Sequence, residues 1–238
     1  MKGFLRLLLV PLFIGGAFAG PSGVVAEQEA QPQVDPSINA RYQEPDFDSW
    51  VRIFESPGRE VYDKREAIVQ ATGVKAGQTV ADIGAGTGLF TLIFAEEVGP
   101  NGRVYAVDIS RSFIRNIERR ALERGFGNVE GIVNDQRSVK LAGQTVDVAF
   151  ISDTYHHFEY PREIVSSVHR ALRPDGTLVV IDFRKQGVDG WVQGHVRATK
   201  STVAEEIESL GFELVEDRDL MEKNYFLRFR KVAGPDYP

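Results

Sequence analysis

The chain has 238 residues, of which 42% are hydrophobic and 26% are charged, as is ordinary for a globular protein. Its formal net charge of −6 at pH 7 disfavours nucleic acid or an anionic membrane surface as a partner. The absence of cysteine excludes disulfides, a thiolate nucleophile and a cysteine-based zinc site. The length suits one domain with a large core and is too short for two full ones.

Residues 1–19 have the three parts of a secretory signal peptide. Basic residues precede an apolar run that is short for a spanning helix, and the small-residue sequence AFA follows it. Cleavage is expected after Ala19 or, alternatively, after Ala26; an uncleaved anchor and a misassigned start codon are the competing interpretations. We therefore expect a periplasmic or secreted protein with no stable membrane association after leader removal. Residues 20–45, rich in Pro, Gln and Ala, predict a flexible segment.

Helical periodicity begins near residue 46 and predicts two amphipathic helices, over 47–56 and 59–74. We expect these helices to form a cap, residues 46–75, on a domain that spans 46–232.

From residue 79 onward, predicted strands alternate with predicted helices. The strands are expected over 79–83, 103–109, 129–134, 145–152, 177–183, 212–217 and 225–231. The helices between them are expected over 87–99, 110–125, 161–173 and 203–211.

Local signals set the expected ends of these helices. Ser110 is the predicted N-cap of its helix, and Gly99 and Pro174 are expected to stop two others. Thr202 and Glu205 predict a capping box for the last helix.

The order of these elements predicts an α/β fold. Alternating strands and helices require a parallel, doubly wound sheet with helices on both faces. The final two strands are joined by a short connection and form a hairpin. We therefore expect a mostly parallel seven-stranded sheet with an antiparallel C-terminal hairpin strand.

Three glycines, at positions 84, 86 and 88, follow the first strand of this sheet. Such a turn lies at the carboxyl end of a strand, where open α/β sheets bind ligands, although glycine-rich turns also serve packing alone. Asp108 ends the second strand about 20 residues later, where a carboxylate can bind a ribose. The spacing G-x-G-x-G differs from dinucleotide and phosphate-loop motifs, so we expect a nucleoside without a pyrophosphate.

Four motifs in order, VADIGAGTG, YAVDIS, VNDQ and ALRPDGTLVVID, resemble those of class I S-adenosylmethionine-dependent methyltransferases. The chain is most similar to the small-molecule group of types 11 and 25, which includes the quinone-biosynthesis enzymes. The resemblance covers nearly everything from Trp50 onward. It implies a Rossmann-like fold, S-adenosyl-L-methionine as cofactor and methyl transfer to a small-molecule acceptor.

The resemblance also implies which residues bind the cofactor. Asp82 and the glycine loop would hold its methionine end, and Asp108 would bind the ribose. Ile109 would pack on the adenine, and Asp135 would receive the adenine amino group. The implied set is Asp82, Gly84, Ala85, Gly86, Gly88, Asp108, Ile109 and Asp135.

Candidates for the acceptor side follow the fourth strand, in the segment 152–161. Tyr155 and His156 are the candidate catalytic residues, because a phenol or imidazole can orient or deprotonate an acceptor. Adjacent side chains diverge, so only one of His156 and His157 is expected to face the site. A structural role, with hydrogen bonds to neighbouring backbone, is the alternative for both histidines.

Two further segments are candidates for covering the acceptor. Arg59, Tyr62 and Arg65 form either a lid or a solvated helix face with charge pairing. The segment 184–201, which contains His195, predicts a mobile substrate loop.

A metal site could draw on Asp153, His156, His157 and His195, but no ligand spacing compels one, and we predict none. The lack of cysteine argues against the related methylation of arsenicals. An exported binding protein without turnover is the alternative function, because the cofactor is made in the cytoplasm. An NAD-type oxidoreductase is disfavoured by the glycine spacing. The acceptor atom (O, N or C) and the oligomeric state remain open.

Overall fold

The computed structural model describes residues 31–185 and 190–234. The predicted signal peptide and residues 20–30 lie outside these ranges, so export stays a prediction. Within them, every helix is too short or too polar to cross a lipid bilayer.

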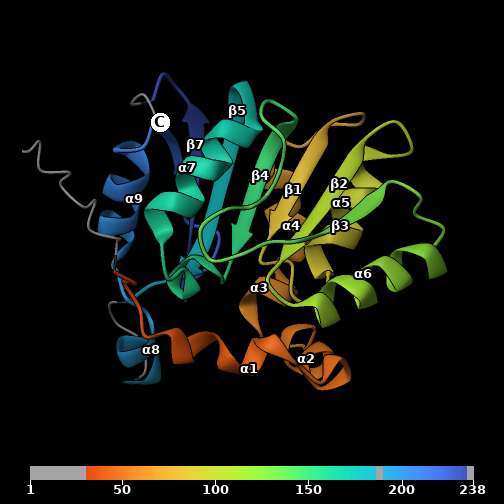
Figure 1. The fold of residues 1–238 in the computed structure, drawn as a ribbon, viewed down its shortest axis with the longest axis horizontal. Helices are drawn as coiled ribbons and strands as arrows, with labels where there is room; N and C mark the ends of the chain where they lie inside the picture. Colours follow the sequence, from red (N-terminus) through yellow and green to blue (C-terminus); the bar gives the residue numbers. More distant parts are fainter. Residues whose placement is uncertain (1–30, 186–189, 235–238) are drawn as a thin grey trace, which may run out of the picture. The chain divides into compact units, whose positions relative to one another are not determined.

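In the described part of the chain, seven strands form one sheet in the order β3-β2-β1-β4-β5-β7-β6 (Figure 1). Neighbours from β3 to β5 pair in parallel, and β7 pairs antiparallel with both β5 and β6. This confirms the predicted mostly parallel sheet with an antiparallel strand from the C-terminal hairpin. The strands are β1 (Thr79–Ile83), β2 (Arg103–Asp108), β3 (Val129–Val133), β4 (Val146–Ser152), β5 (Leu172–Phe183), β6 (Phe212–Arg218) and β7 (Asn224–Lys231).

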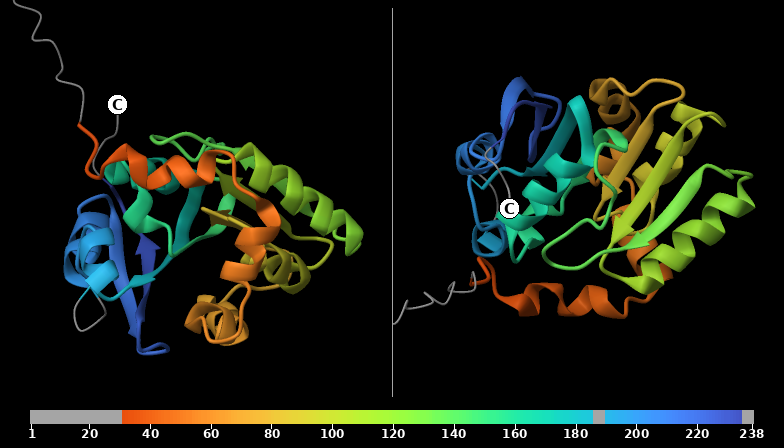
Figure 2. Two further views of the ribbon diagram at one scale, coloured as in Figure 1. Left: turned by 90° about the horizontal axis from the view of Figure 1, so that it is seen from below. Right: turned by 45° about the horizontal axis from the view of Figure 1, so that its top comes forward.

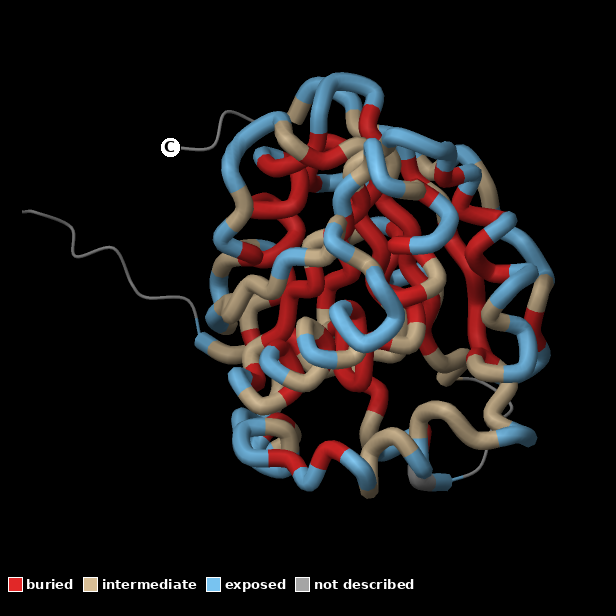
Figure 3. The backbone as a smooth tube through the Cα atoms, turned by 90° about the vertical axis from the view of Figure 1, so that its right-hand side faces the viewer, coloured by how far each residue is buried: buried red, intermediate tan, exposed pale blue. Residues whose placement is uncertain are grey.

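Helices cover both faces of the sheet. On one face, Phe90 and Phe94 of α5 pack against Phe150 of β4, with ring centroids 4.8 and 5.1 Å from its ring. On the other, Ile164 belongs to the larger apolar cluster together with Ile151. The first face carries α4 (Arg65–Thr72), α5 (Leu89–Val98) and α6 (Arg111–Glu123), and the second α7 (Pro161–Ala171) and α9 (Lys200–Glu208). The backbone is buried along the central strands and exposed at the helix surfaces (Figure 3).

The predicted helix ends were partly right. Ser110 caps α6 by accepting a hydrogen bond from the Phe113 N–H, and α5 ends at Gly99. The predicted capping box is wrong: α9 begins three residues earlier, because the Thr199 hydroxyl accepts from the Thr202 N–H.

Two element boundaries also differ from the prediction. The helix expected over 59–74 is interrupted at Lys64, which divides it into α3 (Glu60–Asp63) and α4. The break lets Glu60 reach toward β7, where its carboxylate accepts two backbone N–H groups. Strand β5 begins at Leu172, before the proline expected to separate it from the helix, and its pairing with β4 shifts register there.

Residues 31–45 are ordered, so the predicted flexible segment is wrong over this range. They form η1 (Pro36–Asn39) and α1 (Ala40–Gln43), which α2 (Phe47–Phe54) follows. Asn39 is buried and donates to the His157 carbonyl and the Glu159 carboxylate, at 3.0 and 3.1 Å. Helices α1 and α2 lie across the carboxyl-terminal edge of the parallel strands (Figure 2).

Candidate functional site

Helices α1 and α2 form an N-terminal cap. A cavity of about 760 Å³ opens between this cap and the carboxyl ends of the strands. Its wall includes side chains that end or follow β1, β2, β3, β4 and β5. It is the position at which open α/β sheets bind ligands, and it places side chains from distant segments around one space. We describe it as two ends, the β1–β2 end and the β4–β5 end.

Two buried carboxylates form the β1–β2 end. Asp82 accepts a 2.6 Å hydrogen bond from the Thr91 hydroxyl, and burial raises its pKa to about 7. Asp108 accepts from the backbone N–H groups of Gly86 and Ser110, at 2.9 and 2.8 Å. Burial raises the pKa of Asp108 to about 6. Buried carboxylates with raised pKa values favour a cationic, hydroxyl-bearing ligand that supplies donors.

In the glycine loop, Gly84 and Gly86 lack a side chain for different reasons. Gly84 has φ +73°, and a Cβ there would lie 2.2 Å from Thr154 Cγ2, so the neighbouring β4 segment excludes it. Gly86 has φ +55°, and its Cβ would lie 3.3 Å from the ring of Phe54 and 3.9 Å from the Gly84 carbonyl oxygen. Both glycines line the cavity, and a side chain is excluded by Thr154 at Gly84 and disfavoured by the positive φ and the Phe54 ring at Gly86.

Of the other residues implied to bind the cofactor, some line the cavity and one does not. Ala85, Ile109 and Asp135 line the cavity. Asp135 is exposed and accepts from two backbone N–H groups that follow it, while Lys140 forms an ion pair with it at 3.1 Å. Gly88 does not line the cavity. Its missing Cβ leaves room for Ile117 of α6 instead.

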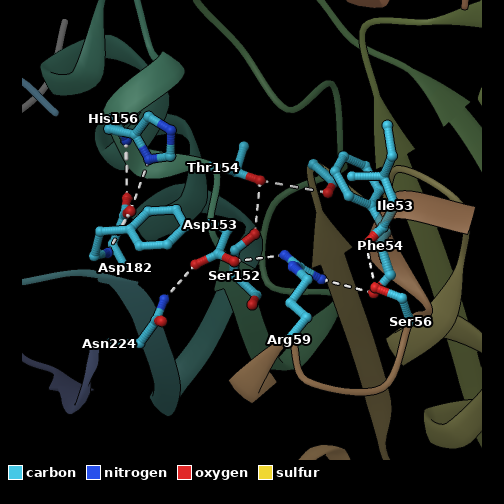
Figure 4. Close-up of polar contacts among 12 residues, drawn as sticks. Ile53, Phe54, Ser56, Arg59, Ser152, Asp153, Thr154, His156, Asp182 and Asn224 are labelled. Atoms are coloured by element: carbon cyan, nitrogen blue, oxygen red, sulfur yellow. Dashed lines mark hydrogen bonds and ion pairs between the residues drawn. The ribbon is translucent and has the colours of Figure 1, made fainter. Parts of the chain in front are cut away.

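His156 forms the centre of the β4–β5 end, on η2 (Tyr155–His157). Its Nδ1 lies 2.7 Å from Oδ1 of Asp182, and its backbone N–H donates to Oδ2 at 3.0 Å (Figure 4). Burial lowers the pKa of His156, and the Asp182 carboxylate raises it by more, so the net shift is upward. Because Asp182 accepts the Nδ1 proton, the Nε2 atom is the ring nitrogen left for other partners.

Two more histidines lie beside His156. Both His157 and His195 line the cavity, so the expectation that only one of the adjacent histidines faces it is wrong. His195 ends α8 (Gly190–His195), which is helical where a mobile loop was predicted. Burial lowers the pKa of His157 to about 2 and also lowers that of His195, which keeps both rings neutral at pH 7.

The structure does not support a catalytic role for Tyr155. Its side chain is 1% exposed and packs in the core beside Phe158. Its hydroxyl donates to Glu206, at 3.0 Å, and Glu206 pairs with Arg197. Successive residues of a 3₁₀ turn point about 120° apart, which sends Tyr155 into the core and its neighbour into the cavity.

Asp153 connects the cap to the sheet, a role that the sequence did not predict. The sequence suggested it only as a possible metal ligand. It accepts from Arg59 and from Asn224, each at 2.5 Å, as Figure 4 shows. Arg59 also donates to the Phe54 carbonyl at 2.9 Å. The lid interpretation of Arg59 therefore fits its position, since its guanidinium lines the cavity between α2 and β4.

Asp182 is the residue that the sequence analysis missed. The only local signal is a carboxylate near the carboxyl end of an otherwise apolar strand, TLVVIDF. An aromatic row on the cap was also missed: Tyr42 and Trp50 stack at 4.8 Å, and Trp50 and Phe54 at 4.9 Å. All three rings line the cavity.

Comparison with known proteins identifies the family. Residues 74–231 match the family model described as a methyltransferase domain. The ubiquinone/menaquinone biosynthesis C-methyltransferase UbiE of Ectopseudomonas mendocina is 33% identical over 120 residues, which are 50% of this chain and 47% of that protein. UbiE of Hydrogenovibrio crunogenus is 32% identical over 123 residues, 51% of this chain and 48% of that protein. The chain thus matches these curated relatives over about half their length.

Solved structures share the fold. An S-adenosylmethionine-dependent methyltransferase from Aquifex aeolicus superposes with a TM-score of 0.68 at 24% identity, over 84% of this chain and 100% of that one. The [4+2]-cyclase SpnF superposes at 0.65 with 19% identity, over 76% and 86% of the two chains. A cyclase with this architecture shows that the fold alone does not specify the reaction. The family-model match and the sequence relatives together establish that the chain belongs to the class I S-adenosylmethionine-dependent methyltransferases.

Proposed function

We propose that the protein transfers a methyl group from S-adenosylmethionine to a small-molecule acceptor bound in the β4–β5 end of the cavity. One observation carries the proposal. A single cavity is lined both by the buried Asp82 and Asp108 carboxylates and by His156, which Asp182 holds in place.

The residues of the β1–β2 end fit the cofactor. The carboxylate of Asp108 has unused acceptor positions beside its two backbone bonds, which suits the paired hydroxyls of a ribose. Asp82 and the Gly84–Gly86 backbone would hold the methionine end. When bound, S-adenosylmethionine supplies a methyl group on a positively charged sulfur. The chain's own task is then to position the acceptor and exclude water.

The β4–β5 end supplies the groups that meet the acceptor. The ring of Tyr42 lies beside His157, and Trp50 and Phe54 continue this row of apolar surfaces toward Gly86 at the β1–β2 end. Such flat surfaces favour a planar, ring-containing acceptor. Nε2 of His156 faces this space and can orient an acceptor or take a proton from it. We therefore retain His156 as the proposed catalytic residue.

Two measurements test the proposed function. Calorimetric titration with S-adenosylhomocysteine, with NAD as the comparison, should show binding of the first ligand alone. Incubation with methyl-labelled cofactor and an extract of the source organism should yield a labelled small molecule. Binding without any labelled product, across extracts and ring-containing test compounds, would favour the alternative of a binding protein without turnover.

The leader sequence supports a second, separate proposal, that the mature protein is exported. N-terminal sequencing of the native protein should begin at Gly20 or Glu27. An intact Met1 in a cytoplasmic fraction would contradict export and would leave the methyltransferase proposal untouched.

A further inference from the structure

Three histidines from two distant segments meet in the cavity. His156 and His157 follow β4, and His195 ends α8, some forty positions later in the sequence. One potential ligand atom from each lies within 4.8 Å of the other two. Among the described residues, this is the one group of three such side chains close enough to hold a metal ion.

The first histidine is already oriented as a metal ligand. Its Nδ1 lies 2.7 Å from a buried Asp182 oxygen, which leaves Nε2 as the coordinating atom. Metal-binding histidines are usually held in this way, by a carboxylate that fixes the tautomer and raises the basicity of the ligand. The Asp182 side chain is 2% exposed, so its charge acts through a medium that screens it weakly.

The second histidine has an unsatisfied polar atom. Nδ1 of His157 is buried and has no hydrogen-bond partner. A buried polar atom without a partner is costly, and a metal ion is one way to satisfy it. The ring also packs edge-on against Tyr42, with centroids 5.1 Å apart, so the cap limits its rotation.

The geometry is close to that of a tetrahedral site. Zn–N bonds of about 2.0–2.1 Å place the nitrogens of a tetrahedral site about 3.4 Å apart. Atoms now within 4.8 Å of one another must therefore approach by at most about 1.4 Å to reach this geometry.

We propose that His156, His157 and His195 bind one divalent transition-metal ion, with Zn²⁺ as the best match, and leave a fourth position open to the cavity. Three imidazoles and an open position are the ligand set of a catalytic zinc site, whereas Mg²⁺ and Ca²⁺ require oxygen ligands. The Asp182 carboxylate offsets the charge of the ion. The positive charge of Arg41 acts against metal binding, because, after burial and the neighbouring histidines, it also lowers the pKa of both His157 and His195.

The role of the open position rests on the proposed function. An oxygen of the acceptor would occupy it, so His156 would act through the ion and would not take a proton itself. The ion would orient the acceptor and lower the pKa of a bound hydroxyl. The acceptor class is then a ring compound with a hydroxyl or carbonyl oxygen. Metal binding itself does not depend on methyl transfer, so the two can be tested separately.

The experiment uses the full chain without a histidine tag, freed of metal by a chelator. Titration with Zn²⁺ should show one equivalent bound, and titration with Co²⁺ should give the visible spectrum of a tetrahedral site. His195→Gln should abolish the Co²⁺ spectrum, and Asp182→Asn should weaken Zn²⁺ binding 10- to 100-fold. His169→Gln is the matched control, because His169 lies on α7 outside the group and bonds to the Val232 carbonyl.

S-adenosylhomocysteine affinity, measured on the same samples, shows that each variant is folded and distinguishes the two proposals. Absence of stoichiometric Zn²⁺ binding, or equal binding by His195→Gln and the unaltered chain, would overturn the metal site. If cofactor binding and methyl transfer persisted in that case, the proposed function would stand. Zn²⁺ binding at the three histidines in a chain with no cofactor affinity would overturn the proposed function alone.

Discussion

The two ends of the cavity differ in how far apart along the sequence their hydrogen-bonded partners lie. At the β1–β2 end, Asp82 bonds Thr91, and Asp108 bonds Ser110 and Gly86, so every partner lies within 22 residues. At the β4–β5 end, Asp182 holds His156 from 26 residues away, Arg59 reaches Asp153 across 94, and Asn39 bonds the His157 carbonyl across 118. The proposed cofactor end is thus held by contacts within a short stretch of chain, whereas the proposed acceptor end is assembled from segments far apart in the sequence.

The largest expected effect tests whether the two ends share a structural element. Gly84→Val places a Cβ 2.2 Å from Thr154 at a positive φ, and should cost on the order of 3 kcal/mol or more of stability. Thermal unfolding and cofactor titration should both register the loss. Gly77→Ala is the control: its φ of +82° is similar, but open space surrounds it, so only the backbone strain remains. Equal losses in the two variants would show that Thr154 moves aside.

The next prediction separates the ends by function. His156→Gln should lower methyl transfer by about 10²- to 10⁴-fold while leaving the dissociation constant of S-adenosylhomocysteine unchanged, because the residue lies at the end of the cavity proposed for the acceptor and not at the end proposed for the cofactor. Tyr155→Phe is the control, since its hydroxyl bonds Glu206 outside the cavity and should matter little for turnover. A cofactor affinity that fell together with turnover in His156→Gln would break the division into two ends.

The reverse variant acts on the other end. Asp108→Ala removes the carboxylate proposed to accept hydrogen bonds from the ribose hydroxyls. It should weaken S-adenosylhomocysteine binding by on the order of 1.5–3 kcal/mol. Calorimetry measures this directly. Glu130→Gln serves as the control, because this exposed carboxylate on β3 only pairs with Arg103 at the surface. An unchanged dissociation constant in Asp108→Ala would remove Asp108 from the site.

The last prediction concerns a pH dependence at the β1–β2 end. The folded-state pKa of Asp82, about 7, lies above the ordinary carboxyl value near 4. The folded chain therefore binds a proton that the unfolded chain releases, and this contribution to stability declines as pH rises from about 4 to about 7. The Asp82→Asn variant lacks this contribution, so its melting temperature relative to that of the unaltered chain should rise between about pH 4 and about pH 7, the span of that transition. A constant difference would mean that Asp82 is ionised when folded.

Local chemistry explains which features the sequence could predict. The Ser110 cap follows from residues within a few positions of one another, and the mostly parallel sheet with its antiparallel hairpin strand follows from the rules for alternating elements. The N-cap at Thr199 was missed because two candidate hydroxyls lie three residues apart, and the local sequence does not distinguish Thr199, which caps the helix, from Thr202.

The β4–β5 end shows where such reasoning stops. Tyr155 and His156 are adjacent and chemically plausible, and only the direction of the η2 turn decides which one enters the cavity. Asp182 sits among apolar residues of β5, and nothing in its neighbourhood reveals its histidine partner. Residues 31–45 have a composition typical of flexible segments, yet Asn39 secures them through long-range hydrogen bonds.

The position of β7 has a consequence for how the protein is made. Among the strands of the described residues it comes last along the chain, yet it inserts between β5 and β6. Its first residue, Asn224, holds Asp153, and the backbone just before it bonds Glu60 beside the cap. During synthesis, the contacts of Asp153 and Glu60 with this segment can therefore form only after residues 222–224 have left the ribosomal exit tunnel, and a chain that stopped before β7 would lack this part of the cavity wall.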